Sequence, residues 1–205
     1  MLNDELVRYL FDNRPHPLTE VVAGWLGSLR PFATFAHTFR DKIRKKLRSI
    51  QTEDGILDLR LELEVAFLLL HERSFSLAYE PQPPGLVRGP DFAVTYTTSH
   101  TFMLEITRLR AEILAQSGTA DLAGVQSPNW LVSERVGQTI AGKLGQLLPQ
   151  QSNVLLIGVE GGSLTTATLH AAMIRSRATM IISWMEKEER DVDCTNTSDP
   201  CSIWC

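Results

Sequence analysis

The sequence predicts an α/β fold with a mixed sheet and a helical extension at its N-terminus. Three segments predict it: a helix rich in Leu and Glu at residues 57–73, two alternating strands within residues 92–107, and a continuous apolar run at residues 153–159. Helices and strands in this order are typical of helices packed on a mixed sheet. With 205 residues, of which 43% are hydrophobic, the chain is long enough for one domain with a proper core.

Residues 1–50 are predicted to form the helical extension, and they carry the one basic patch. Residues 30–48 contain seven basic residues against the single acid Asp41, although the net charge of −4 argues against a surface that binds nucleic acid everywhere. On a helix we expect a basic ridge that contacts phosphates without reading sequence, formed by Arg40, Lys42, Arg44, Lys45, Lys46 and Arg48. The alternative is an ordinary solvated helix.

Residues 57–73 (LDLRLELEVAFLLLHER) form the first helix of an α/β core that is predicted to span residues 51–185. This helix is apolar on nearly every side along part of its length and is therefore expected to be buried. Three apolar residues are helical neighbours of Glu64, namely Leu61, Phe67 and Leu68. A carboxylate among them needs a partner or a cation, whereas Glu62 lies on a different side and is expected to be less embedded. The alternative for Glu64 is a surface ion pair with Arg60.

A strand at residues 74–79 is followed by a predicted hairpin, with strands at 92–97 and 101–107 and a turn at 98–100. A turn centred near Thr98 sets Asp91 opposite Glu105, with their β-carbons about 5 Å apart. The alternation assigns an apolar core face and a small polar face to the hairpin. The core face carries Phe92, Val94, Tyr96, Phe102, Leu104 and Ile106, and the polar face carries Asp91, Ala93, Thr95, Glu105 and Thr107.

Asp91 and Glu105 are the candidate site of the chain. Two carboxylates at such a short distance repel each other, and the usual compensation is a shared proton or a divalent cation. Mg²⁺ prefers oxygen ligands and keeps several waters, so Asp91, Glu105 and the carbonyl of Ile106 suffice to hold it, with Mn²⁺ as the other candidate. The alternative is two solvated acids at strand ends.

The second half of the core is predicted to contain a helix at residues 133–148, a central strand at 153–159 and a helix at about 165–180. Lys143 lies at the edge of the apolar stripe of the first of these helices. Its ammonium either reaches back to water or points inward, where a carboxylate cluster is the natural partner. The glycine-rich turn at residues 158–162 is a weak candidate for a phosphate site, because it matches neither of the common phosphate-binding loops.

Residues 186–205 are expected to form a flexible tail, and they contain all three cysteines. The absence of cysteine from the rest of the chain is consistent with a cytoplasmic protein. The acidic N-terminus lacks the signature of a secretion signal, and no apolar run approaches the length of a membrane span. We therefore expect no membrane partner.

These elements resemble the PD-(D/E)xK nuclease superfamily, which has the restriction-endonuclease-like fold. That family places an acid on its first helix, Pro-Asp at the start of its second strand, and Asp/Glu-x-Lys near the end of its third. Here Glu64, Pro90-Asp91 and Glu105-Ile106-Thr107 stand in those places, in the same order, over about residues 57–160. The chain departs from the pattern at Thr107, where the family usually has lysine.

The resemblance implies a metal-dependent nuclease with Glu64 bordering the cleft of Asp91 and Glu105. The family's lysine helps to orient and activate the attacking water, and the hydroxyl of Thr107 cannot replace its charge. In some members the lysine has moved to the neighbouring helix, and Lys143 is the candidate here. Gln138 and Gln146 could also reach the site, depending on helix phase.

Three functions follow as hypotheses. The first is a Mg²⁺-dependent nuclease that cleaves phosphodiester bonds in nucleic acid, with DNA as the expected partner. The second is a catalytically inactive relative that keeps the fold for binding nucleic acid or protein, which would explain the missing lysine. The third is an unrelated α/β protein that uses the glycine-rich turn for a nucleotide. A homodimer is an open alternative to a single subunit in each case.

Overall fold

The computed structural model describes residues 3–82, 89–109, 128–144 and 151–159, together with His170, Ala172 and Ile174. The chain divides into two compact units, of which the first comprises residues 1–109 and 146–160 and the second residues 110–145 and 161–205. The first unit therefore contains both the N-terminal helices and the sheet. The predicted tail at residues 186–205, and most of the helix predicted at 165–180, lie outside the described residues.

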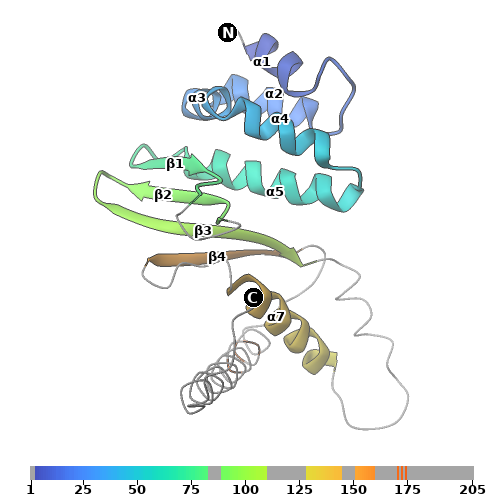
Figure 1. Ribbon diagram of the computed structural model, residues 1–205, viewed down its shortest axis with the longest axis vertical. Coiled ribbons are helices and arrows are strands. Elements are labelled where there is room, and N and C mark those ends of the chain that lie inside the picture. The colour runs from blue at the N-terminus through green and yellow to red at the C-terminus, as the bar shows by residue number, and fades with distance from the viewer. Residues whose placement is uncertain are drawn as a thin grey trace, which may run out of the picture. The chain divides into compact units, whose positions relative to one another are not determined.

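The N-terminal region consists of four short helices: α1 (Asn3–Leu10), α2 (Thr19–Ser28), α3 (Arg30–Thr38) and α4 (Arg40–Ser49). Their buried apolar residues recur at helical spacing, for example Ile43 and Leu47 on α4, so that each helix has one face in the core. In Figure 1 these helices lie next to α5 and the β1 side of the sheet. One continuous cluster of buried residues joins them to both.

Helix α5 (Glu53–Leu69) connects the N-terminal helices to the sheet. It begins at a capped end, because the Thr52 side chain accepts a hydrogen bond from the Gly55 amide at 3.1 Å. Glu53 and Asp54 lie in the first turn, where negative charge stabilises a helix. The helix starts and ends four residues earlier than predicted, since this cap precedes the Leu-rich run.

The sheet has four strands in the order β1-β2-β3-β4: β1 (Phe75–Tyr79), β2 (Phe92–Tyr96), β3 (His100–Leu109) and β4 (Ser152–Val159). The first three are antiparallel neighbours, and β4 pairs with β3 in parallel. The predicted α/β class with a mixed sheet is therefore confirmed. No helix in the described ranges is long and apolar enough to cross a membrane.

The predicted hairpin register is also confirmed. Phe92 pairs with Leu104 and Tyr96 with His100, and continuing this pairing by one residue sets Asp91 opposite Glu105. The core face is correct for most of its members, but Tyr96 is 47% exposed because it lies at the turn end of β2. The opposite face is not the small polar face that was predicted along its whole length. Met103, Glu105 and Leu109 are all buried there.

Strand β4 differs from the prediction of a doubly covered central strand. Within the described part of the chain it lies at the end of the strand order, and Val154 and Val159 are 43% and 38% exposed. A continuous apolar run indicates a strand that can be buried on both faces, but it does not fix how many neighbours the strand has.

Gly158 allows β4 to approach α5. A β-carbon added at Gly158 would lie 2.6 Å from Cδ2 of Leu61. We therefore expect Gly158→Ala to lower the free energy of unfolding by no more than about 1 kcal/mol, because a terminal methyl group of Leu61 must shift. Chemical denaturation measures this, and the cost should disappear in a Leu61→Ala background. Gly142→Ala is the control with the opposite sign: nothing lies within 4 Å of its added β-carbon, and removing a helical glycine stabilises by up to about 1 kcal/mol.

Candidate functional site

Asp91 and Glu105 come together as predicted, at the open end of the β2–β3 hairpin. Asp91 directly precedes β2, and its Oδ2 atom accepts a hydrogen bond from the backbone N–H of Ile106 at 2.8 Å. Its carbonyl accepts a second one from the backbone N–H of Glu80, at 2.8 Å, which ties it to the end of β1. Glu105 is fully buried within β3. The hairpin thus places a half-buried carboxylate beside a fully buried one.

The pKa of Asp91 is raised to about 7. Burial is the largest cause, and the neighbouring carboxylates of Glu62 and Glu105 raise it further. The Ile106 N–H and the Lys46 ammonium act in the opposite direction and do not compensate. The alternative of two solvated acids is wrong for Glu105, which is fully buried. At Asp91, burial and the neighbouring carboxylates together disfavour the charged form.

The helix acid of this cluster is Glu62 rather than Glu64. Glu62 is 7% exposed and contributes to the raised pKa of Asp91. Glu64 has a side chain that is 44% exposed and lies 4.0 Å from Arg60, which is the surface pair left open as its alternative. The expected order of burial is wrong because of helix phase. Glu62 lies on the same side of α5 as Leu59 and Ala66, which are buried. Glu64 comes two residues later and therefore lies on the other side of the helix.

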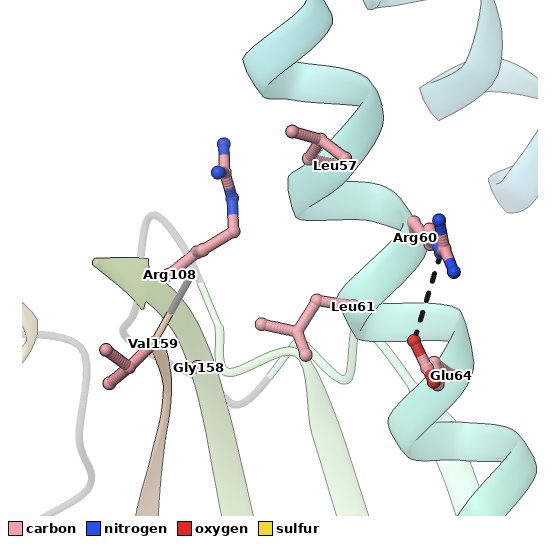
Figure 2. Close-up of a pocket in the computed structure, with 7 residues that line it drawn as sticks. All are labelled: Leu57, Arg60, Leu61, Glu64, Arg108, Gly158 and Val159. Carbon is pink, nitrogen blue, oxygen red and sulfur yellow. Dashed lines mark ion pairs between the residues drawn. The ribbon is translucent and has the colours of Figure 1, made fainter. Parts of the chain in front are cut away.

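Glu64 instead lines a shallow pocket of about 220 Å³ between α5 and the ends of β3 and β4 (Figure 2). The other lining residues are Leu57, Arg60, Leu61, Arg108, Gly158 and Val159. Arg108 is held there by Asp54 at 2.6 Å and Asp58 at 3.0 Å. The pocket contains neither Asp91 nor Glu105, so it is separate from the carboxylate cluster.

Lys46, which was predicted to be part of the basic ridge, faces the cluster. Its Nζ atom lies 2.6 and 2.7 Å from the two carboxylate oxygens of Glu62 and 3.1 Å from Oε1 of Glu80. Burial acts to lower the pKa of Lys46, but the carboxylates of Glu62, Asp91 and Glu80 outweigh it and the pKa is raised. Lys46 is therefore a charged ammonium within the site.

The rest of the predicted ridge is used largely within the fold. Lys42 donates to the carbonyls of Tyr79 and Glu80 at 2.7 and 2.9 Å. Asp12 accepts hydrogen bonds from Arg44, at 2.9 Å, and from Arg48, at 2.6 and 2.7 Å. The remaining two members are Arg40, which lies near the Tyr9 ring, and Lys45, which is exposed. The ridge is thus divided between the site, the loop after α1 and solvent, and phosphate binding by its members stays a prediction.

Two residues at the end of β1 were missed by the sequence reasoning. Tyr79 is buried, and burial together with the carboxylate of Glu62 raises its pKa. Glu80 has a left-handed backbone, with φ of 43°, which is uncommon for a residue other than glycine. This conformation lets Glu80 meet Lys46 through its carboxylate and Lys42 through its carbonyl. No local sequence signal marks either residue, because both depend on contacts with α4.

Thr107 and Lys143 fall in different parts of the molecule. Thr107 is half-buried on β3, where it pairs with Ile157 of β4. Lys143 and Gln138 lie on α7 (Pro128–Leu144), which belongs to the second unit, and Gln146 lies outside the described residues. That Lys143 approaches Glu105 therefore stays a prediction.

The donor set at Asp91 suits a hard cation. In the part of the chain that the structure describes, no group of three or more His, Cys, Asp or Glu side chains is arranged to hold a metal ion. Glu62 is engaged by Lys46, so Asp91 and Glu105 are the carboxylates of this cluster that could ligate a cation. Mg²⁺ and Mn²⁺ accept few protein oxygens and fill the other positions with water, so two carboxylates and the Ile106 carbonyl fit them.

The site therefore combines a half-buried and a fully buried carboxylate on a hairpin, a third carboxylate on α5, and a lysine from α4 held against that third acid. No protein family, curated protein or solved structure matches this chain. Function is therefore argued from the chemistry of these four side chains.

Proposed function

We propose that this protein is a metal-dependent nuclease of the restriction-endonuclease-like fold that hydrolyses phosphodiester bonds in nucleic acid, with DNA as the first substrate to test. The observation that carries the proposal is the environment of Asp91. It is a half-buried carboxylate directly before a strand, beside the buried Glu105 and Glu62, with its pKa raised to about 7. Charge of this kind is costly to maintain, and a bound cation relieves it.

Asp91 and Glu105, with the Ile106 carbonyl, would hold Mg²⁺ or Mn²⁺, which supplies electrostatic stabilisation of the phosphate and a more acidic water. The Ile106 N–H fixes the Asp91 carboxylate by one oxygen and so sets its direction. In the reaction a water oxygen forms a bond to phosphorus, one phosphorus–oxygen ester bond breaks, the water loses a proton, and the leaving oxygen takes up a proton.

The test is cleavage of single- and double-stranded DNA and RNA by the full chain with Mg²⁺ or Mn²⁺. Asp91→Asn and Glu105→Gln keep the side-chain shapes and remove the charges, so we expect each to slow cleavage at least about 100-fold. Glu62→Gln and Glu64→Gln form a matched pair on α5. We expect the first to lose far more activity than the second, because only Glu62 faces Asp91. Cleavage that survives Asp91→Asn would contradict the proposal.

Thr107 favours a second function. It occupies the position at which the PD-(D/E)xK nuclease superfamily, which the sequence resembles, usually has lysine. A catalytically inactive module that binds nucleic acid or protein would keep the carboxylates and lose the chemistry. Metal binding that depends on Asp91, without cleavage of any of the four substrates, would support this function over the first.

A further inference from the structure

The ammonium of Lys46, on helix α4, lies within the carboxylate cluster rather than in solvent. Its ammonium contacts both oxygens of Glu62 and one of Glu80, with its side chain 26% exposed. It also lies 5.2 Å from the centre of the Tyr79 ring. A lysine that serves only solubility would extend into water, because burying an ammonium has a cost that only good partners offset.

Contacts between helix α4 and the end of β1 hold the Lys46 ammonium in this position. One turn earlier on α4, Lys42 bonds two consecutive carbonyls, of Tyr79 and Glu80, and so fixes α4 to the end of β1. Ile43 and Leu47 anchor the adjoining side of the helix in the core. The same β1 end is bonded to Asp91 through the Glu80 amide. Lys46 is therefore held in a fixed relation to Asp91 by three connected elements.

The negative charge of the site favours a cation beside it. The carboxylates of Glu62, Glu80 and Asp91 all act on the Lys46 ammonium, and Glu105 in turn acts on Asp91. The position on β3 where the resembled family has lysine holds Thr107. Lys46 is close enough to Asp91 for each charge to favour the other. Phosphate transfer increases negative charge on the phosphate oxygens, and a fixed cation nearby stabilises it.

We infer that Lys46 supplies to the carboxylate cluster the positive charge that Thr107 cannot, so that helix α4 of the N-terminal region completes the site. This inference rests on the proposed nuclease function for its role in cleavage. Its effect on the affinity for a divalent cation does not depend on cleavage. The ammonium repels a cation bound at Asp91 and Glu105, while it assists a reaction of a phosphate there. Removing it therefore has opposite effects on cation binding and on reaction rate, whereas a lysine that merely supports the fold would weaken both.

The experiment compares Glu62→Gln with the double variant Glu62→Gln and Lys46→Met. Both lack the buried Glu62 charge, so the second leaves no unpaired glutamate at that position and the two differ only by Lys46. Mn²⁺ affinity is measured by calorimetry and cleavage at saturating Mn²⁺ by kcat and KM. We expect the double variant to bind Mn²⁺ about tenfold more tightly and to cleave at least about 30-fold more slowly. Circular dichroism establishes that both are folded at the assay temperature.

Two further variants complete the design. Adding Thr107→Lys to the double variant puts an ammonium on β3, and we expect it to restore cleavage at least about tenfold. Arg8→Met changes an exposed basic residue of α1, outside the predicted ridge. It should leave kcat, KM and Mn²⁺ affinity unchanged.

The outcomes separate the two proposals. Equal or weaker Mn²⁺ binding by the double variant, or a kcat within about threefold of Glu62→Gln, would overturn the role of Lys46 while leaving an active nuclease in place. A parent protein that cleaves no substrate would overturn the nuclease function. In that case, tighter Mn²⁺ binding by the double variant would still show that the Lys46 charge acts on the carboxylate cluster. Unchanged Mn²⁺ binding would show that it does not.

Discussion

Without metal, the Asp91→Asn variant is expected to be more stable than the parent protein at pH 8, by up to about 4 kcal/mol. The folded-state pKa of Asp91 is about 7, above its ordinary value of 3.8. Between these two values the folded protein keeps a proton that the unfolded chain has released. Stability therefore falls as the pH rises from about 4 to 7, and the full cost is present above pH 7. Asparagine resembles the protonated acid and is free of this cost.

The measurement is urea unfolding in a chelator at pH 5, 6, 7 and 8. The free energy of unfolding of the parent should fall across this range relative to that of Asp91→Asn, so that the difference between the two grows with pH. Asp4→Asn, at an exposed acid of α1, is the control and should shift stability by no more than about 0.5 kcal/mol at any pH. Parallel pH profiles for parent and Asp91→Asn would show that Asp91 ionises normally in the folded protein.

The same charge connects stability with the proposed cation. Saturating Mg²⁺ should raise the stability of the parent more at pH 8 than at pH 5, because the cation binds the ionised carboxylate. Asp91→Asn should show little of this gain. The carboxylates that make the metal-free protein less stable are thus the ones that a cation would use.

The hairpin could be predicted from the sequence because its signals are local. The alternation of Phe92, Val94, Leu104 and Ile106 defines a face, and the turn near Thr98 sets the sum of paired residue numbers, so the meeting of Asp91 with Glu105 followed from counting. Turn length and side-chain period are properties of consecutive residues. They carry over directly to the structure.

Glu62 and Lys46 could not be predicted in the same way. Helix α5 has apolar residues on nearly all sides, so its pattern does not say which side faces the sheet, and an error of two residues exchanged Glu64 for Glu62. Lys46 stands among other basic residues, where a charged surface is the natural reading. Its contact with Glu62 depends on how α4 packs on α5 and β1, and that packing is set by residues far apart in the chain.

Lys46→Met, with Glu62 intact, is expected to lower the free energy of unfolding by about 3–5 kcal/mol, since it removes one partner of a buried ion pair. The pair is well shielded, with side chains 26% exposed at Lys46 and 9% at Glu62. Glu62 would then stand as a buried negative charge beside Asp91, whose own ionisation would become harder. Loss of the two hydrogen bonds to Glu62 adds to the cost.

Adding Glu62→Gln to Lys46→Met should recover most of this loss, because a neutral amide is far less costly to bury than an unpaired carboxylate. The two single variants and the double variant form a thermodynamic cycle, measured by denaturant unfolding at pH 7 without metal. Lys45→Met is the matched control and should change stability by no more than about 0.5 kcal/mol. If Lys46→Met and the double variant were equally unstable, the loss would come from the packing of α4 alone. Recovery on neutralising Glu62 would instead show that the charge of Lys46, rather than its packing, is what stabilises the cluster in the folded protein.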